Sequence, residues 1–260
     1  MLRLRKQIAA RRFEVGLSAR WDPRDHFLLR AMGVKQRFGF PRLRSQMFLT
    51  DTLTKPAPRD HRYEYWRSLG RALQLNMPDR QEIVMPRGKT GGAVFIHTGA
   101  GQAIRVWPLE RYRQIVRRLR ESQHRVIVAC DPDQREWWLK AGETAVAMPR
   151  TVNELLGLID EAGVFIGNDS GPGHLAAFCG VPTLSLFGPQ LPEWFSPLHP
   201  ESICLEGKPC PYKPCSDYCR FSAPRCLVEI SEEETWGAVR EFVAHHLGKP
   251  QSSASPLMAL

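Results

Sequence analysis

The stretch Gly163 to Pro189 reads G-V-F-I-G-N-D-S-G-P-G-H-L-A-A-F-C-G-V-P-T-L-S-L-F-G-P. Its first apolar run, Val164 to Ile166, is too short for a buried helix and is typical of a strand buried on both faces. A glycine-rich segment follows, and Leu175 to Phe178 then continue as helix. A second apolar run, Val181 to Phe187, ends at a Gly-Pro pair. The order of strand, glycine-rich turn, helix and strand predicts a βαβ unit.

The turn inside this unit has the composition of an anion-binding turn. Asp169 and Ser170 are both good helix N-caps. Such a turn points unpaired backbone N–H groups and the positive end of a helix at one place, where phosphate is the usual anion. His174 falls in the first helical turn and is predicted to face the same anion. Glycine-rich turns without phosphate are also common in α/β proteins, and a histidine here can simply lie on the helix surface.

The same segment resembles the signature of the heptosyltransferase-like glycosyltransferases, the family that includes the ADP-heptose:lipopolysaccharide heptosyltransferases. The signature runs Asp, Thr or Ser, Gly, two variable positions, His and Leu, then an Ala-rich helix, Gly-x-Pro and a strand ending near Phe-Gly-Pro. Here it stands as Asp169-Ser170-Gly171-Pro172-Gly173-His174-Leu175-Ala176-Ala177, Gly180-Val181-Pro182 and Leu186-Phe187-Gly188-Pro189. The resemblance implies an α/β fold of the GT-B type, in which two Rossmann-like lobes face a cleft and the second lobe holds the sugar nucleotide.

Composition and charge indicate how many cores the chain can bury, whether it spans a membrane and where its charge lies. With 260 residues, 43% of them apolar, the chain can bury one or two cores, and it has no apolar run long enough to span a membrane. The Arg-rich N-terminus lacks the apolar stretch of a secretory signal, which favours a cytoplasmic protein. The net charge of +9 is carried by residues 1–44, where three acids stand against twelve basic residues: Arg3, Arg5, Lys6, Arg11, Arg12, Arg20, Arg24, Arg30, Lys35, Arg37, Arg42 and Arg44.

This basic segment allows several partners. Aromatic residues are not interleaved with its charges, so a nucleic-acid partner is not expected. An anionic inner-membrane surface or a phosphorylated glycolipid acceptor fits the charge and the phosphate turn better. The arginines can equally do no more than solvate a surface.

Residues 1–90 are predicted to form an incomplete, acceptor-side α/β lobe. Phe13 to Ser18 and Lys35 to Phe40 have the pattern of strands, and Pro23 to Met32 and Tyr63 to Leu75 that of helices. This order resembles the later part of the family's N-terminal domain, which normally starts earlier with a strand and a glycine-containing turn. The resemblance implies that the missing piece supplies the carboxylate that acts as general base.

Asp22 and Asp25 are the acids that follow the first predicted strand of this lobe, and they are weak candidates for that base. Asp22 precedes Pro23, however, and an acid directly before a proline is also typical of a helix N-cap.

The second lobe is predicted to span residues 91–250, after a linker at Pro86 to Gly92, with a loose tail at 251–260. Its first strand, Ala93 to His97, ends at the turn Thr98 to Gly101. Open α/β sheets place their ligands at this end of a parallel strand, so Thr98 is a candidate donor-binding residue.

The family resemblance also implies a cation, usually lysine, two positions before Trp-Pro. Here it is Arg105, in Arg105-Val106-Trp107-Pro108. Either cation neutralises a departing diphosphate, and arginine does so through a fork of donors. Arg105 can also be an ordinary loop cation. Pro108 suits the first position of the helix that follows.

The rest of the second lobe alternates strands and helices. Arg125 to Cys130 is predicted to be a strand, and the resemblance implies an acid after it that binds the ribose, either Asp133 or Glu136. Thr144 to Met148 has the pattern of a short strand. The predicted helices begin at Trp137, at Leu155 behind the capping box Thr151-Val152-Asn153-Glu154, and at Glu232 behind Ser231.

A cysteine-rich loop follows the second lobe's regular part. Cys210, Cys215, Cys219 and Cys226 are four thiols that can hold a structural Zn²⁺ or Fe ion, although the two-residue spacing of a zinc knuckle is absent. Free thiols are the alternative, and a cytoplasmic location disfavours disulfides. Many members of the resembled family carry a similar loop, which here ends at Cys226-Leu227.

The leading hypothesis is a glycosyltransferase that moves a heptose or related sugar from a nucleoside-diphosphate sugar, ADP-heptose by resemblance, to a lipopolysaccharide-core or similar acceptor. The predicted donor-binding residues are Thr98, Arg105, Asp133, Glu136, Asp169, Ser170, Gly171, Pro172, Gly173 and His174. No cofactor is required for catalysis, since a helix end, an arginine and a histidine can neutralise the diphosphate. The alternative is a non-catalytic sugar-nucleotide-binding fragment or pseudoenzyme that lacks the N-terminal base; a start codon placed too late would also explain the short lobe. A dehydrogenase is disfavoured because no G-x-G-x-x-G follows a predicted strand.

Overall fold

A computed structural model describes residues 13–83, 91–215 and 218–248, and the chain divides into two compact units, Met1–Asp79 and Arg80–Leu260. Both units combine helices with wholly parallel sheets, which confirms the α/β class. The division falls ahead of the predicted linker, most of which lies outside the described residues together with the predicted tail. None of the helices in the described part combines the length and the apolarity needed to cross a bilayer.

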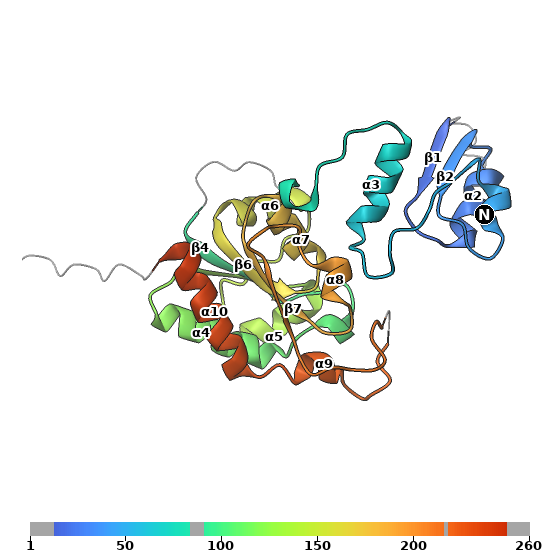
Figure 1. Ribbon diagram of the computed structural model, residues 1–260. Helices are drawn as coiled ribbons and strands as arrows, with labels where there is room; N and C mark the ends of the chain where they lie inside the picture. The colour runs from blue at the N-terminus through green and yellow to red at the C-terminus, as the bar shows by residue number, and fades with distance from the viewer. Residues whose placement is uncertain (1–12, 84–90, 216–217, 249–260) are drawn as a thin grey trace, which may run out of the picture. The chain divides into compact units, whose positions relative to one another are not determined.

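The first unit holds a small parallel sheet of order β1 (Val15–Ser18), β2 (Gln36–Gly39) and β3 (Asp51–Thr52). Its helices are α2 (Pro23–Ala31), the 3₁₀ turn η1 (Ser45–Phe48) and α3 (Tyr63–Ala72) (Figure 1). The predicted strands and helices are confirmed, each shorter at one or both ends, whereas β3 was not predicted.

Aromatic residues fill the core of the first unit. The rings of Phe40 and Tyr65 meet edge to face with centroids 4.9 Å apart, and Phe38 and Leu69 complete the cluster. Such a pair adds directional stabilisation to the area that it buries. The core therefore joins β2 to α3.

The second unit is built on a five-stranded parallel sheet of order β5-β4-β6-β7-β8. The strands are β4 (Ala93–His97), β5 (Val126–Ala129), β6 (Ala162–Asn168), β7 (Thr183–Phe187) and β8 (Ile203–Glu206). The helices are α4 (Leu109–Glu121), α5 (Arg135–Lys140), α6 (Val152–Asp160), α7 (Gly171–Phe178), α8 (Pro192–Phe195), α9 (Arg225–Val228) and α10 (Glu232–Leu247), with 3₁₀ turns η2 (Arg80–Glu82), η3 (Ala103–Arg105) and η4 (Pro132–Gln134).

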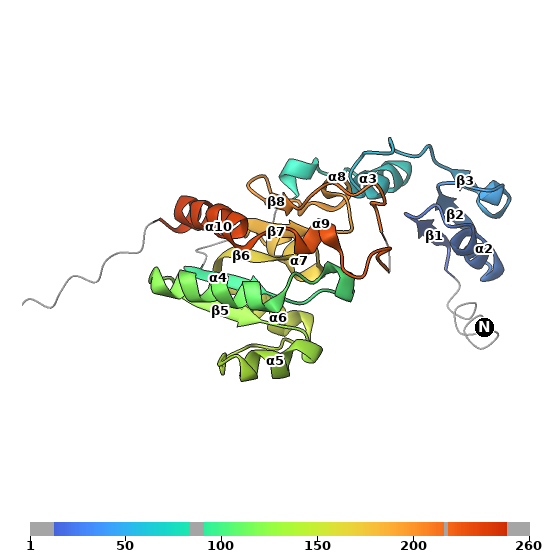
Figure 2. The same ribbon diagram turned by 90° about the horizontal axis from the view of Figure 1, so that it is seen from below.

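Alternation along the strands separates two layers of helix. Val94 and Ile96 belong to the core that includes α4 and α10, which lie side by side in Figures 1 and 2. Phe95 and Phe165 pack edge to face, 5.4 Å apart, in the core on the other face, with α6 and α7. Burial on both faces is why these strands read as continuous apolar runs.

The strand order reverses at β4. The chain leaves β4 through α4 to reach β5 on one side, and then returns through α6 to β6 on the other side. In open α/β sheets, the crevice at the carboxyl end of the strands at such a reversal is where ligands bind. The loops that follow β4 and β6 meet at this point.

Local capping sets several helix boundaries. Thr151 and Ser231 accept hydrogen bonds from the backbone N–H of Glu154 and Glu234, both at 3.2 Å, so both predicted caps are confirmed. Pro108 stands at the N-cap position and not at the first helical position as predicted. The predicted strand at Thr144 to Met148 is reduced to one isolated bridge, between Ala129 and Ala147, and β8 was not predicted at all.

Candidate functional site

The side-chain amide of Asn168, the last residue of β6, holds the loop after β4 in place at the site. Its Nδ2 donates to the carbonyl oxygens of Thr98, at 2.8 Å, and Gly99, at 3.3 Å. Its Oδ1 accepts from the backbone N–H of Trp107, at 3.0 Å, and from the hydroxyl of Tyr112, at 2.9 Å. One fully buried side chain thus fixes both ends of the loop that follows β4 against the end of β6.

This loop brings Arg105 to the turn after β6. Its Nη1 lies 3.4 Å from Oδ2 of Asp169, and its buried Nε has no hydrogen-bond partner among the described residues. The Asp169 side chain is only 5% exposed. Burial raises the pKa of Asp169 to about 6, against the charges of Arg105 and Lys213, which lower it.

The start of α7 adds two further polar groups. Ser170 holds the N-cap position, but its hydroxyl makes no capping bond; the oxygen is buried and unpartnered within the described part of the chain. Nε2 of His174 lies 3.9 Å from Oδ1 of Asp169. Burial, and then the charge of Arg105, lower the pKa of His174, which favours its neutral form.

The glycines of this turn have different tasks. A side chain on Gly171 would meet no atom within 4 Å, so the backbone there is open to a ligand. A Cβ on Gly173 would lie 3.3 Å from Cε1 of Phe165, so Gly173 allows α7 to approach β6 closely. Pro172, between them, lies in the first helical turn, where its missing N–H leaves no intrahelical bond unmade.

These groups together form a candidate anion site. Ser170 contributes a buried hydroxyl at the N-terminus of α7, and Arg105, 3.4 Å from Asp169, contributes a guanidinium N–H; neither atom has a partner among the described residues. Buried polar groups normally have partners, so their shared lack of one indicates a ligand with several acceptor oxygens. The structure thus brings Arg105, Asp169, Ser170 and His174 together, as the sequence predicted.

A hollow of about 770 Å³ lies beside the anion site, between the loops that follow β4 and β5. Its walls come from Ala100, Gly101, Ala103, Val106, Trp107, Pro108, Leu109, Asp131, Pro132, Asp133, Gln134 and Trp137. Of the two predicted ribose-binding acids, Asp133 lines this hollow, whereas Glu136 points to solvent and pairs with Lys140 at 2.6 Å. The size suits a nucleoside.

Asp131 also lines the hollow, and the sequence analysis missed it. A Cβ on Gly99 would overlap the carboxylate of Asp131, so any other residue at position 99 would require the Asp131 side chain to move. The buried His97 supports the same corner, because its Nδ1 accepts from Gly99 N–H at 3.3 Å and its Nε2 lies 3.9 Å from Asp131. An acid directly after a buried strand is the signal that would have identified it.

Thr98 positions neighbouring loops, and its side chain is not free to contact a bound sugar nucleotide. Its fully buried hydroxyl donates to Oε1 of Gln134 at 2.8 Å and accepts from Nε1 of Trp138 at 3.1 Å. Both hydrogen bonds lead to the segment after β5. Thr98 therefore holds the loops after β4 and β5 in register.

Lys213, in the cysteine-rich loop, is a cation that the sequence analysis did not single out. Its side chain is 9% exposed, and its Nζ lies 2.5 Å from Oε1 of Glu206. Its charge lowers the pKa of Asp169, so it contributes positive potential at the anion site. No local signal distinguishes it from any other loop lysine.

None of the four cysteines of this loop forms a disulfide with another described residue. Burial raises the pKa of Cys226 to about 11; the charge of Lys213 lowers it, and Cys210, Cys219 and Cys215 raise it further. The four sulfurs therefore interact. Within residues 13–83, 91–215 and 218–248, however, the one set of at least three metal-ligating side chains with ligand atoms within 4.8 Å of one another lies elsewhere, at Glu201, His245 and His246.

The two candidate bases of the first unit are engaged locally. Asp22 is the N-cap of α2, as the alternative reading of the sequence predicted, and accepts from Arg24 N–H at 2.9 Å. The Arg24 guanidinium, 2.6 Å away, holds the pKa of Asp22 well below its usual range. Asp25 accepts from the Ser18 hydroxyl at 3.4 Å and lies 3.9 Å from Arg20. A carboxylate paired as tightly as that of Asp22 is a poor proton acceptor.

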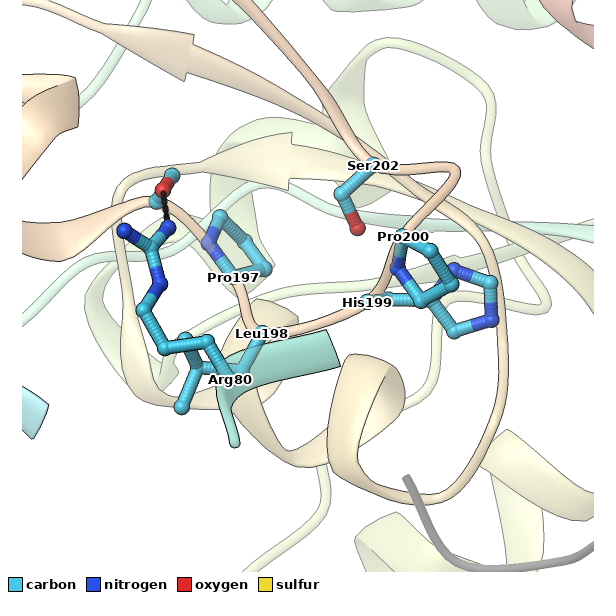
Figure 3. A pocket seen from close by; sticks show the side chains of 7 residues that line it. Arg80, Pro197, Leu198, His199, Pro200 and Ser202 are labelled. Carbon is cyan, nitrogen blue, oxygen red and sulfur yellow. Dashed lines mark hydrogen bonds between the residues drawn. The ribbon is translucent and has the colours of Figure 1, made fainter. Parts of the chain in front are cut away.

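A second hollow of the second unit, about 360 Å³, is shown in Figure 3. It is lined by Arg80 and by the segment 196–202, and the guanidinium of Arg80 lies 3.4 Å from the hydroxyl of Ser196. None of the predicted site residues lines it.

Comparison with curated proteins finds lipopolysaccharide heptosyltransferases. Lipopolysaccharide heptosyltransferase 3 of Escherichia coli K12 is 27% identical over 151 residues, which is 54% of this chain and 39% of the relative. Lipopolysaccharide heptosyltransferase 1 of Pseudomonas aeruginosa is 31% identical over 151 residues, 52% of this chain and 42% of the relative. The matched span is thus about two fifths of either relative.

Solved structures and a family model agree with this. E. coli heptosyltransferase WaaC with ADP superposes with a TM-score of 0.68 at 16% identity, over 93% of this chain and 76% of that one. A family 9 glycosyltransferase from Veillonella parvula DSM 2008 gives 0.67 at 20% identity, over 94% and 77%. These likenesses confirm the GT-B type of fold. The model of glycosyltransferase family 9 (heptosyltransferase) matches residues 1–222, and the chain belongs to this family.

Proposed function

We propose that this protein binds a nucleoside-diphosphate sugar at the carboxyl edge of its five-stranded sheet and transfers the sugar, a heptose or a related one, to a lipopolysaccharide-core or similar saccharide acceptor. The observation that carries the proposal is the convergence of Arg105, the unpartnered hydroxyl of Ser170 and the start of α7 at the point where the strand order reverses. A diphosphate supplies the acceptor oxygens that these donors lack.

The neighbouring hollow gives the nucleoside a place. With the diphosphate at Arg105 and Ser170, the nucleoside would extend into the hollow between the loops after β4 and β5. Asp131 and Asp133 there are carboxylates that can accept hydrogen bonds from the ribose hydroxyls. ADP is the nucleotide that we favour, because the related WaaC was solved with ADP and with ADP-2-deoxy-2-fluoro heptose.

The transfer reaction consists of three events. An acceptor hydroxyl forms a bond to the anomeric carbon, the bond from that carbon to the diphosphate oxygen breaks, and the hydroxyl proton goes to a base. Arg105, Lys213 and the start of α7 stabilise the charge that builds up on the leaving diphosphate. Asp169 orients Arg105 and His174 between these donors. The positive charge is thus supplied by the protein, and the proposal requires no divalent cation.

A second candidate is a nucleotide-sugar-binding protein without turnover. The observation in its favour is that Asp22 and Asp25 are held by arginines and by the α2 cap. Release of nucleoside diphosphate in the presence of acceptor separates the two candidates.

The cysteine-rich loop supports a further proposal, a structural Zn²⁺ or Fe ion held by Cys210, Cys215, Cys219 and Cys226. The other three cysteines influence the pKa of Cys226, and a cation bound among the four sulfurs would favour their thiolate forms. Mass spectrometry of protein purified without tag or chelator tests it, and a protein without stoichiometric metal would contradict it.

We place the protein in the cytoplasm, in peripheral contact with the anionic inner-membrane surface. In the described part of the first unit, the exposed Arg24, Arg30, Arg42 and Arg44 lie close in sequence to exposed apolar residues, namely Phe27, Leu28, Leu43 and Met47. A surface of this composition binds anionic lipid headgroups. Co-sedimentation with vesicles that contain anionic lipid checks this.

Calorimetry with ADP, UDP and GDP tests the central proposal. We expect one nucleotide to bind the wild type and His174→Ala to weaken it. His124→Ala, at a histidine beyond the end of α4, is the matched control and should bind as the wild type does. No binding of any nucleotide by the wild type would refute the donor site, whereas binding that His174→Ala leaves unchanged would refute only the role of that residue.

A further inference from the structure

Three metal-ligating side chains meet outside the donor site. One ligand atom each from Glu201, His245 and His246 lies within 4.8 Å of the others. Oε1 of Glu201 is 3.8 Å from Nε2 of His245. Glu201 comes from the connection between α8 and β8, and the two histidines come from the last turn of α10. Segments more than forty residues apart in sequence thus bring their ligand atoms together.

The connection is held on both sides of Glu201. Its own N–H donates to Nδ1 of His199 at 3.1 Å, and the His199 ring bonds in turn to the backbone of Gly180. Directly after it, the hydroxyl of Ser202 lies 2.6 Å from that of Thr183, at the start of β7. Figure 3 shows His199, Pro200 and Ser202 on this turn of chain. The backbone of Glu201 is therefore fixed, and its carboxylate is free to turn.

The histidines are held on the helix side. The ring of His246 packs edge to face on Phe242, with centroids 4.6 Å apart, and against the ring of His245 at 4.7 Å. Burial lowers the pKa of His246; the charge of Glu201 raises it and that of His245 lowers it. Burial thus favours the neutral imidazole, which is the form that binds metals.

We propose that Glu201, His245 and His246 bind a divalent transition-metal ion, with zinc as the best match. Two imidazoles and one carboxylate, with water as fourth ligand, form a common tetrahedral zinc set. In such a set the ligand atoms lie about 3.3 Å apart, so they must approach slightly from their present positions. The side chains of His245 and Glu201 are 71% and 55% exposed, so small rotations of their outer bonds achieve this.

The position of the site indicates a structural ion. Ser202 hydrogen-bonds to Thr183 at the start of β7, and Leu247 lies against Gly163 near the start of β6, so the cluster lies at the amino edge of the sheet. Arg105 and Ser170 lie at the carboxyl edge. The ion would tie the end of α10 to the connection before β8 and so stabilise the second unit. This proposal does not depend on the proposed function.

The test compares zinc uptake by the full chain and by the double variant Glu201→Gln, His245→Gln. Both proteins are stripped with EDTA, loaded with ZnCl₂, desalted and analysed for metal. We expect the variant to retain one zinc per chain fewer than the wild type, because any metal at the cysteine-rich loop is common to both. His124→Gln is the matched control for a histidine outside the cluster and should retain as much zinc as the wild type.

Thermal unfolding supplies the second measurement. In EDTA the double variant should unfold at the wild-type Tm, since both altered side chains are exposed. Added ZnCl₂ should raise the Tm of the wild type more than that of the variant. If the double variant does not fold, Glu201→Gln alone serves, with a zinc affinity lower by about tenfold or more. Equal zinc content and equal Tm shifts in wild type and variant would overturn the proposal.

Discussion

At two strand-to-helix turns of this protein an aspartate lies beside an arginine. The pKa values of the two aspartates are shifted in opposite directions. At the β1–α2 turn, Asp22 caps the helix and binds the Arg24 guanidinium at 2.6 Å, which holds its pKa well below the usual range. At the β6–α7 turn, Asp169 is 5% exposed, lies 3.4 Å from Arg105, and has a pKa raised by burial to about 6.

The different environments of Asp22 and Asp169 show that sequence context alone does not assign the role of an acidic residue. Both residues precede a helix and have a nearby arginine. Asp22 has its acceptors satisfied by Arg24, so its ionised form is favoured and its task is local. Asp169 is buried among donors that lack partners, and this is the pattern of a site whose ligand completes it.

Replacing the arginine at each turn should give the largest difference between the two turns. Arg105→Ala removes the guanidinium that would face the leaving diphosphate, and we expect the rate of sugar transfer to fall on the order of 10²- to 10³-fold. Arg105→Lys keeps the charge and should retain much of the rate. Arg24→Ala, the matched change at the other turn, should leave it unaltered. Nucleoside-diphosphate release with acceptor present is the measurement, and equal rates for Arg105→Ala and wild type would contradict the prediction.

Replacing each aspartate by asparagine should change stability in opposite directions. The pKa of Asp169 rises from 3.8 to about 6 on folding, so the folded protein binds a proton that the unfolded chain releases between these values. Ionisation of Asp169 thus opposes folding, by about 3 kcal/mol above pH ~6 and by nothing below pH ~4. Asp169→Asn should stabilise the protein by up to about 3 kcal/mol near neutral pH, less what the lost pairing with Arg105 contributes.

Asp22→Asn is the control for this experiment. The pKa of Asp22 is lowered on folding, so its contribution to stability is present above the unfolded pKa and is lost as the pH falls through the folded value. Asp22→Asn should therefore lower the urea midpoint near neutral pH. Urea unfolding of both variants across the acid range checks the two signs, and a destabilised Asp169→Asn protein at neutral pH would show that the buried carboxylate contributes to the fold.

The smallest expected effect concerns Ser170. Its buried hydroxyl has no partner in the described part of the chain, so Ser170→Ala removes no hydrogen bond from the free protein. Stability should stay unchanged, whereas nucleotide affinity should fall about tenfold, or ~1.4 kcal/mol, through the loss of one hydrogen bond to a charged group. Calorimetry and thermal unfolding of the same variant separate the two outcomes. A lower Tm with unchanged affinity would assign Ser170 to the fold.

Local patterns were enough to predict most of the second unit. The bounds of β4, Ala93–His97, and of α10, Glu232–Leu247, agree with the structure, because a strand buried on both faces and a serine cap are signals contained in a few neighbouring residues. The strand β8, Ile203–Glu206, was missed because it is a partly exposed edge strand behind a proline-rich segment. The segment around Ala147 has a strand-like pattern but a single bridge partner.

The site divides in the same way. Arg105, Asp169, Ser170 and His174 were predicted because their motif is contiguous or lies next to Trp-Pro. The engagement of Thr98 by Gln134 and Trp138, and the approach of Lys213 toward Asp169, depend on how distant loops pack, which no local pattern records. Sequence analysis likewise could not choose between Asp133 and Glu136, because one helical turn decides which of them lines the hollow.

The amide of Asn168 determines which neighbouring residues can be replaced during evolution without loss of the loop structure. In the loop after β4 it binds only main-chain atoms, the carbonyls of Thr98 and Gly99 and the N–H of Trp107. Because side chains take no part in these bonds, residues 100–104 can be exchanged without loosening the loop. Neither aspartate nor leucine can replace the amide, since it must donate on one side and accept on the other. This single requirement at Asn168 thus leaves the surrounding positions available for adaptation to a different ligand.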